Sequence, residues 1–230
     1  MTAALLAAVA AVAQLPTCHA GYRTLGSQRA AYAAVAQVPL RAYAQPAGRA
    51  VGQFGLENAN GAPTVFGVLG KLVGPDCAAR WYRVELPMRP NGATGWVRAW
   101  TVSVVRVRTR IVVDVSARQL VLYRNGRAVL RTTTAVGAPA TPTPTGRFYV
   151  NQRLLPTNPE GPFGPGAIGI SAFSNVLTGW TQGGPIAIHG TNAPWSIGRS
   201  VSNGCIRVAN PVLRRLFRAV LAGTPVVIRP

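Results

Sequence analysis

The sequence predicts a mainly β protein with two folded units and a single helix near its C-terminal end. Short apolar runs separated by glycine and proline fill most of the chain, and they lack a helical period. One pair of runs is joined by Asn125-Gly126, which is typical of a two-residue hairpin turn. Only residues 210–221 carry helical spacing. The 230 residues suffice for one ordinary domain and a small one, and 48% hydrophobic against 13% charged residues argues against a disordered chain.

The first twenty residues are small and apolar and end in Cys18-His19-Ala20. They resemble the apolar core and small-residue cleavage site of a secretory signal, although the usual positive start is missing. We therefore expect residues 1–20 to be a signal segment and the protein to be extracytoplasmic, either secreted or periplasmic. Residues 21–37 are rich in alanine, glutamine and tyrosine with little pattern, and they are predicted to be a linker.

Residues 38–105 are predicted to form a small β-barrel, because several short strand-like runs follow one another without a helical period. The expected strands lie at residues 50–54, 64–69, 81–86 and 95–97. The pair Trp81-Tyr82-x-Val84 and Gly95-Trp96-Val97, joined through Pro90-Asn91-Gly92, resembles bacterial Src-homology-3-like domains.

A second unit is predicted over residues 108–229. Strands are expected at residues 111–115, 119–123, 129–136 and 146–150, and a closing strand at 224–229. The proline-rich residues 156–166 are expected to be an ordered loop near the site. The helix is expected to be capped by Asn210, with Pro211 in its first turn and Gly223 after its end. Its apolar stripe is expected to pack on the sheet; the stripe consists of Leu213, Leu216, Phe217, Val220 and Leu221.

The chain has a formal net charge of +19, with only five acidic residues and Lys71 as the one lysine. This balance favours polyanionic partners such as nucleic acid, an anionic membrane surface or an acidic cell-wall polymer. An arginine-rich surface that is merely soluble explains it equally well. The expected export segment speaks against nucleic acid.

Three cysteines leave two readings of the disulfide state. Either Cys18 is removed with the signal segment, or cleavage falls earlier and Cys18 pairs with Cys77. A reactive thiol must not be tied up in a bridge, so Cys77 is not expected to bond to Cys205.

The candidate chemistry centres on His189 and Cys205. His189 is the only histidine outside the first nineteen residues, and it follows an alternating apolar run that predicts a strand end. A thiol is a useful nucleophile only as thiolate, and a neighbouring imidazole can take its proton. No acid lies near His189 in sequence, so its orienting acceptor is expected to be a backbone carbonyl.

Residues around the thiol suggest supporting roles. Gly204 allows a tight turn whose N–H groups could form an oxyanion hole, with polar contacts from Ser202 and Asn203. Arg207 falls on the same face of an extended segment as the thiol and could hold a substrate carboxylate. Neither paired histidines nor a Cys-x-x-Cys spacing is present, so no metal site is expected.

At this point the residues resemble the L,D-transpeptidase catalytic family. The matching pieces are Ile188-His189-Gly190-Thr191, Ser202-x-Gly204-Cys205-Ile206-Arg207, Asp114-x-x-x-x-Gln119-Leu120-x-Leu122-Tyr123, Val136-Gly137, Thr143-Pro144-Thr145-Gly146-x-Phe148 and Gly223-Thr224-Pro225-Val226. One departure is Asn203, where the family usually has a histidine, and this puts the level of activity in question. The resemblance implies a β-sandwich catalytic domain over residues 108–229 that needs neither metal nor cofactor.

The resemblance also implies a two-step acyl transfer on peptidoglycan stem peptides. Cys205 would attack after the third residue of a tetrapeptide and release D-alanine, and an amine or water would resolve the thioester into a 3→3 cross-link, an attached amine or a hydrolysed stem. It adds Gly190 to the supporting residues and Thr191, Ser171 and Phe173 to the substrate-binding ones. Carbapenems are expected to acylate the cysteine, and anionic wall polymers are candidate partners.

Two other functions remain open. The protein could be a non-catalytic wall-binding module with a degenerate catalytic domain. It could also be a sortase, which uses histidine, cysteine and arginine in the same chain order, although the close Arg207 fits that class poorly.

Overall fold

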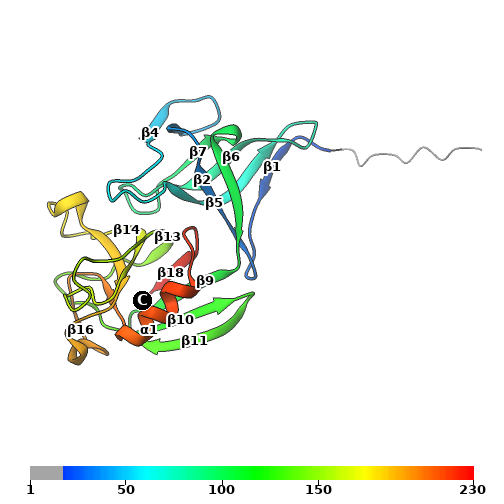
Figure 1. The fold of residues 1–230 in the computed structure, drawn as a ribbon. Coiled ribbons are helices and arrows are strands. Elements are labelled where there is room, and N and C mark those ends of the chain that lie inside the picture. The colour runs from blue at the N-terminus through cyan, green and yellow to red at the C-terminus, as the bar shows by residue number, and fades with distance from the viewer. Residues whose placement is uncertain (1–17) are drawn as a thin grey trace, which may run out of the picture.

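The computed structural model describes residues 18–230, so most of the expected signal segment lies outside the described residues. The described chain forms two β units, one above the other in Figure 1, and one α-helix. The first unit contains β1 (Gly21–Thr24), β2 (Ala31–Ala36), β3 (Leu40–Tyr43), β4 (Ala50–Phe54), β5 (Val65–Val73), β6 (Ala79–Glu85), β7 (Thr94–Arg98), a 3-10 turn at Ala99–Thr101 and β8 (Val102–Val107). The second unit contains β9 (Thr109–Asp114), β10 (Gln119–Arg124), β11 (Arg127–Thr133), β12 (Val136–Gly137), β13 (Gly146–Leu154), β14 (Ala167–Phe173), a 3-10 turn at Thr181–Gly183, β15 (Pro185–His189), a 3-10 turn at Pro194–Ser196, β16 (Ser200–Ser202), β17 (Ile206–Arg207), α1 (Asn210–Ala219) and β18 (Pro225–Arg229). The predicted mainly β class with one short C-terminal helix is confirmed.

The first unit is an antiparallel sheet in the order β4-β3-β7-β6-β5-β2-β8, with β1 paired to β5. It encloses its own apolar cluster, in which Phe66 and Val84 are fully buried. The prediction of a linker over residues 21–37 is wrong, because β1 and β2 lie there. Ala33 and Ala34 are fully buried, so small side chains that gave no clear pattern in the sequence are core residues of this sheet.

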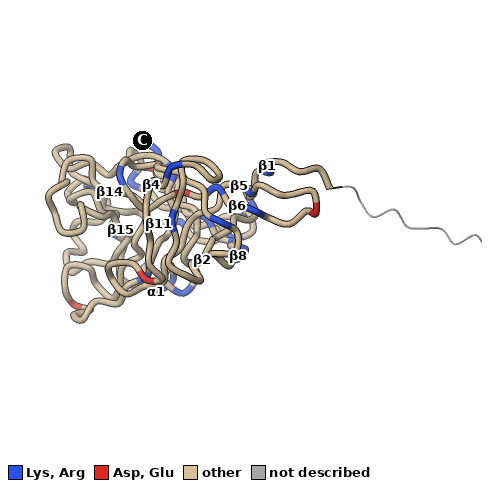
Figure 2. The backbone as a smooth tube through the Cα atoms, turned by 90° about the horizontal axis from the view of Figure 1, so that it is seen from above, with Lys and Arg blue, Asp and Glu red and all other residues tan. Residues whose placement is uncertain are grey.

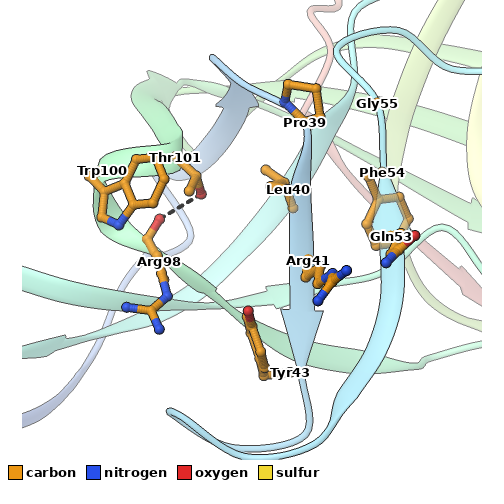
Figure 3. A pocket seen from close by; sticks show the side chains of 10 residues that line it. All are labelled: Pro39, Leu40, Arg41, Tyr43, Gln53, Phe54, Gly55, Arg98, Trp100 and Thr101. Atoms are coloured by element: carbon orange, nitrogen blue, oxygen red, sulfur yellow. Dashed lines mark hydrogen bonds between the residues drawn. The ribbon is translucent and has the colours of Figure 1, made fainter.

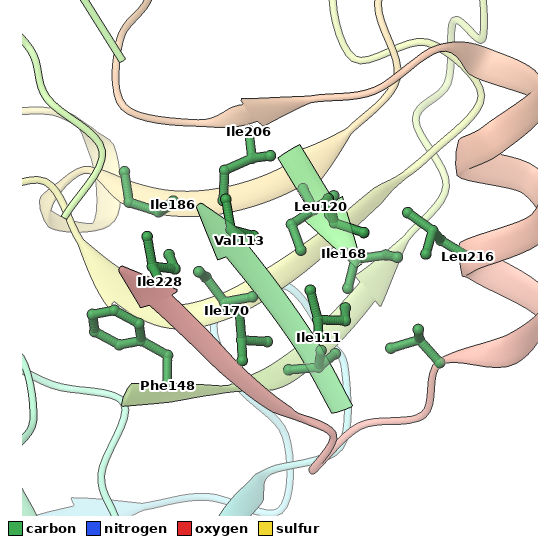
Figure 4. Close-up of a cluster of buried hydrophobic side chains, with 14 of the residues drawn as sticks. Ile111, Val113, Leu120, Phe148, Ile168, Ile170, Ile186, Ile206, Leu216 and Ile228 are labelled. Atoms are coloured by element: carbon green, nitrogen blue, oxygen red, sulfur yellow. The ribbon is translucent and has the colours of Figure 1, made fainter. Parts of the chain in front are cut away.

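The second unit is built on an eight-stranded mixed sheet in the order β11-β10-β9-β18-β13-β14-β15-β17. Branched aliphatic side chains from its strands fill one face, as Figure 4 shows for Ile111, Val113, Ile168 and Ile228. The hairpin between β10 and β11 has the expected turn, since Asn125 and Gly126 both have positive φ, at 52° and 82°.

The helix packs on this sheet as predicted, through the buried Leu213 and Leu216. Its predicted cap is wrong. Asn210 lies inside the first turn, and its Oδ1 accepts a hydrogen bond of 2.8 Å from the N–H of Thr191. The helix start is thereby fixed to the segment that follows His189. No helix within residues 18–230 combines the length and apolar character needed to cross a bilayer.

A disulfide joins Cys18 to Cys77, which selects the second of the two readings of the cysteines. Among the described residues Cys205 is then the one free thiol, as expected. The bond ties the chain just before β1 to the turn between β5 and β6, so Cys18 is part of the folded first unit.

Gly223 lies where the two units meet, and its replacement by alanine is expected to destabilise the protein by about 2–4 kcal/mol. Its φ is +85°, and an added Cβ would overlap Ala33 of β2. Urea denaturation monitored by circular dichroism measures the change. Gly179→Ala is the matched control, because open space surrounds Gly179. Equal midpoints for the two variants would contradict the close approach at Gly223.

Candidate active site

The candidate site is formed by two neighbouring parallel strands, β15 and β17. Their register pairs Ile188 with Ile206 and His189 with Arg207. Side chains alternate across a strand, so residues one step away from the paired isoleucines face the other way. Ile188 and Ile206 are fully buried in the core, which places His189, Arg207 and, just before β17, Cys205 on the opposite face. The structure therefore brings the two predicted catalytic residues to one face of the sheet.

His189 is held in one orientation by the backbone. Its side chain is 4% exposed, and Nδ1 lies 2.5 Å from the carbonyl oxygen of Gly190. A carbonyl only accepts, so Nδ1 carries the hydrogen and Nε2 is left as the acceptor of a proton. The Phe163 ring packs edge-on against the imidazole at 5.0 Å between centroids. The expectation of a backbone carbonyl as the orienting partner is confirmed.

A tight turn presents the thiol. Gly204 has a φ of +103°, and the Ser202 hydroxyl closes the turn by donating to the Cys205 carbonyl (2.5 Å) and accepting from the Gly204 N–H (3.2 Å). Thr143 fixes the same turn from outside, since its hydroxyl donates to the Gly204 carbonyl at 2.9 Å and accepts from the Gly137 N–H at 2.8 Å. Ser202 is therefore a turn-closing residue, and the Gly204 N–H is already used within the turn.

Cys205 is half-buried and lines a cavity of about 800 Å³. Both units contribute to its wall: Asn60 comes from the first, and Leu154, Phe163, Trp180 and Ala187 are among those from the second. The loop between β14 and β15 supplies Trp180, of which 54% is exposed. The cavity is open to solvent and wide enough for a peptide segment.

None of the four predicted substrate-binding residues, Arg207, Thr191, Ser171 and Phe173, lines this cavity. Thr191 is buried, and its hydroxyl accepts from the N–H of Ala193. Ser171 is buried, and its hydroxyl accepts from the N–H of Tyr149 inside the sheet. Phe173 lies at the junction of the units beneath the Arg89 guanidinium. The two hydroxyl groups are thus used in local structure, and a substrate-binding role for these last three residues stays a prediction.

The remaining predicted residues differ in their surroundings. The Gly190 N–H bonds to the Gly166 carbonyl, so Gly190 supports the site by orienting His189 and donates nothing to it. Asn203 is exposed at the turn. Arg207 lies beside His189, and its Nε is buried without a hydrogen-bond partner among residues 18–230.

Some residues that shape the site were not predicted to act there. Thr143 holds Gly204 and Asn210 holds Thr191, in each case through a side chain that is distant in the sequence from its partner. Asn60 lines the Cys205 cavity from the first unit. Thr143 lies in one of the family-like motifs, and this was the one available signal. Asn60 belongs to the first unit, so its distance from Cys205 in the sequence does not indicate that it lines the same cavity.

The thiol and the imidazole are both uncharged in the resting site, beside the charged Arg207 guanidinium. Burial lowers the pKa of His189 to about 4; the hydrogen bond to Gly190 opposes this shift, and the nearby Arg207 adds to it. Burial raises the pKa of the Cys205 thiol, against smaller opposing effects from the Ala187 N–H and Arg207. A neutral thiol and a neutral imidazole therefore lie on the same face of the sheet.

This neutrality predicts the pH dependence of thiol alkylation. Alkylation of Cys205 by iodoacetamide is expected to rise at a pH above the usual thiol range, because burial disfavours the thiolate. His189, followed by NMR, is expected to take up its proton near pH 4 instead of about 6.5. Rates measured by intact mass between pH 6 and 11 test the first expectation. A midpoint below pH 8 would indicate a preformed thiolate–imidazolium pair.

No group of three or more potential metal ligands occurs within the part of the chain that the structure describes. The side chains at the site are a thiol, an imidazole and a guanidinium. Thiol and imidazole together are suited to covalent acyl transfer.

The fold and the site define a class: mainly β proteins with a thiol and a backbone-oriented imidazole on one sheet face. A family model described as YkuD, L,D-transpeptidase catalytic domain, matches residues 108–228. The chain belongs to this family.

Curated relatives agree with this assignment. The chain is 42% identical over 118 residues to a putative L,D-transpeptidase YkuD of Bacillus subtilis, covering 51% of this chain and 64% of that one. It is 37% identical over 73 residues to a probable L,D-transpeptidase YcfS of Escherichia coli, covering 32% and 20%. The chain spans less than two thirds of the length of these relatives.

Solved structures to which the chain shows similarity include two L,D-transpeptidases. One is the catalytic domain from E. faecium, with 27% identity, a TM-score of 0.39 and coverage of 53% of this chain and 96% of that one. The other is from Mycobacterium smegmatis, with 18% identity, a TM-score of 0.43 and coverage of 86% and 99%.

Proposed function

We propose that the protein is an L,D-transpeptidase that acts on peptidoglycan stem peptides through an acyl-enzyme on Cys205. The observation that carries the proposal is the placement of Cys205 and His189 on one face of paired strands. The solvent-open cavity beside the thiol supports it, because a peptide segment fits there. Family membership supplies the reaction class.

In the first step the Cys205 sulfur attacks the carbonyl after the third stem residue, and its proton passes to Nε2 of His189. The Cys205 N–H has no backbone partner within residues 18–230 and is the proposed donor to the oxyanion. When the C–N bond breaks, His189 returns the proton to the departing D-alanine amine. A thioester remains.

In the second step an amine or water attacks the thioester. The new bond forms at the carbonyl carbon, the C–S bond breaks, and His189 transfers a proton from the acceptor to the Cys205 sulfur. An amine from a neighbouring stem gives a 3→3 cross-link, and water gives a shortened stem. Asn203 cannot carry a proton, so His189 does all the proton transfer in this scheme.

Such a substrate places the protein outside the cytoplasm, at the cell wall. Figure 2 shows Lys and Arg on both units and few acidic positions, which suits an anionic wall polymer as partner.

The test is incubation of the full chain with a disaccharide tetrapeptide, followed by mass spectrometry of the products and the protein. Release of D-alanine together with a thioester adduct would support the proposal. A carbapenem is a second probe, expected to add one adduct to Cys205. A protein that forms neither adduct while its thiol stays accessible would overturn it.

A second candidate function is wall binding without catalysis. A groove of about 540 Å³ crosses β3 in the first unit, between the side chains drawn in Figure 3. Its wall includes Tyr43, Phe54 and Trp100, the last 71% exposed, with Arg41 and Arg98. Aromatic faces and guanidinium groups suit sugar rings and carboxylates. Co-sedimentation with insoluble peptidoglycan that depends on Trp100 but not on Cys205 would favour this function.

A further inference from the structure

A second cavity, of about 320 Å³, lies between the two units next to the Cys205 cavity. The two share four lining residues: Asn60, Gln152, Gln182 and Pro185. The two cavities therefore adjoin along these four residues. We call the second the junction pocket.

The junction pocket differs in charge from the rest of this basic protein. Its polar lining residues are one carboxylate and neutral side chains, namely Glu57, Gln53, Asn58, Asn60, Thr64, Asn151, Gln152 and Gln182. Of the described residues that line it, none is lysine or arginine, although the chain carries 24 of them. Such a wall attracts an anion less strongly than the rest of the surface does. Its oxygen acceptors can accommodate an ammonium or amine group.

The amides of the pocket are held in place across the junction. Oε1 of the buried Gln152 accepts from Nδ2 of Asn58 and of Asn60, each at 3.0 Å. Asn60 and Gln182 form a reciprocal pair, with Gln182 Nε2 donating to Asn60 Oδ1 at 2.9 Å and Asn60 Nδ2 donating back at 3.3 Å. The first unit thereby fixes the wall that the two cavities share.

The loop that carries Gln182 is also clamped at its base. Nη2 of Arg89 donates to the carbonyls of Ser174 and Gly183, at 2.6 and 2.7 Å. Its positive charge is thus directed at the two ends of the loop. The first unit therefore sets the position of a loop that borders both cavities.

One carboxylate faces the pocket. Glu57 is exposed and is the acidic residue among those that line it. Its two oxygens can accept hydrogen bonds from an incoming ammonium and pair with its charge.

We propose that the junction pocket is the acceptor subsite, which holds an amine-bearing peptide while the acyl group is on Cys205. This rests on the proposed function. The amine arrives as ammonium, loses one proton to water and attacks the thioester carbonyl. The C–N bond forms, the C–S bond breaks, and the second proton passes through His189 to the sulfur. The first unit, on this account, builds half of a substrate site.

The test is the partition of the acyl-enzyme between amine and water. The full chain is given a tetrapeptide donor and an amine-bearing stem peptide, and cross-linked and hydrolysed products are counted per D-alanine released. Glu57→Gln and Asn60→Ala are each expected to lower the ratio of cross-linked to hydrolysed product about three- to tenfold. Glu160→Gln is the matched control, because Glu160 is an exposed carboxylate that lines neither cavity. An unchanged ratio in both variants would overturn the proposal.

A binding measurement keeps the inference separate from the proposed function. The amine-bearing stem peptide is titrated into Cys205→Ala and into Cys205→Ala/Glu57→Gln, and affinity is measured by calorimetry. Weaker binding to the double variant supports the subsite even if the wild type releases no D-alanine, in which case only the proposed reaction fails. Equal affinities, or no binding to either protein, overturn the subsite.

Discussion

Cys205→Ala is expected to lower D-alanine release from a tetrapeptide donor by about 10⁴-fold or more, because the covalent route is lost. The carbapenem adduct should vanish as well. The side chain is half-buried at the edge of a cavity, so its truncation leaves the core intact. Steady-state release and intact mass measure the two effects.

The control for folding is the disulfide between Cys18 and Cys77, which must remain in the variant. Thiol titration should then fall from one group to none. Substantial D-alanine release by Cys205→Ala would show that another group is the nucleophile and would contradict the mechanism.

His189→Gln is expected to slow acylation of Cys205 by about 10²–10⁴-fold, the usual effect of removing a general base. The glutamine amide can keep a hydrogen bond to the Gly190 carbonyl, which preserves the local backbone. The defect should shrink as pH rises, because hydroxide then takes the proton that Nε2 would have taken. Stopped-flow acylation by a carbapenem across pH measures this.

His19→Gln is the matched control, since His19 is the other histidine in the chain and is exposed. It should leave acylation unchanged. A defect in His189→Gln that stays constant at every pH would indicate a purely structural role for the imidazole.

The placement of His189 and Cys205 on one face was predictable because few residues of either type are available. His189 is the one histidine beyond residue 19, and the buried Ile188 and Ile206 with polar neighbours indicate which face each strand presents. The core of the second unit and the Asn125 turn follow from the same alternation and from turn chemistry.

The linker prediction failed for a physical reason that also limits what the sequence says about substrate residues. Small alanines at 33 and 34 are buried because another strand packs close to them, and this is a tertiary fact that local pattern does not contain. The hydroxyl groups of Ser171 and Thr191 each accept a hydrogen bond from a backbone N–H, of Tyr149 and Ala193 respectively. The resemblance of the first unit to Src-homology-3-like domains stays a prediction.

The position of β18 has a consequence for the order of folding. This strand spans residues 225–229, yet it lies between β9 and β13 at the centre of the sheet. Within that sheet β18 joins the strands that begin the unit to the strands that lead to the thiol, and residues 135–138 add a second connection through their bonds to residues 199–207. During synthesis the sheet is therefore not complete until residues 225–229 have emerged, and the high contact order of the pairing with residues 111–114 predicts slow folding.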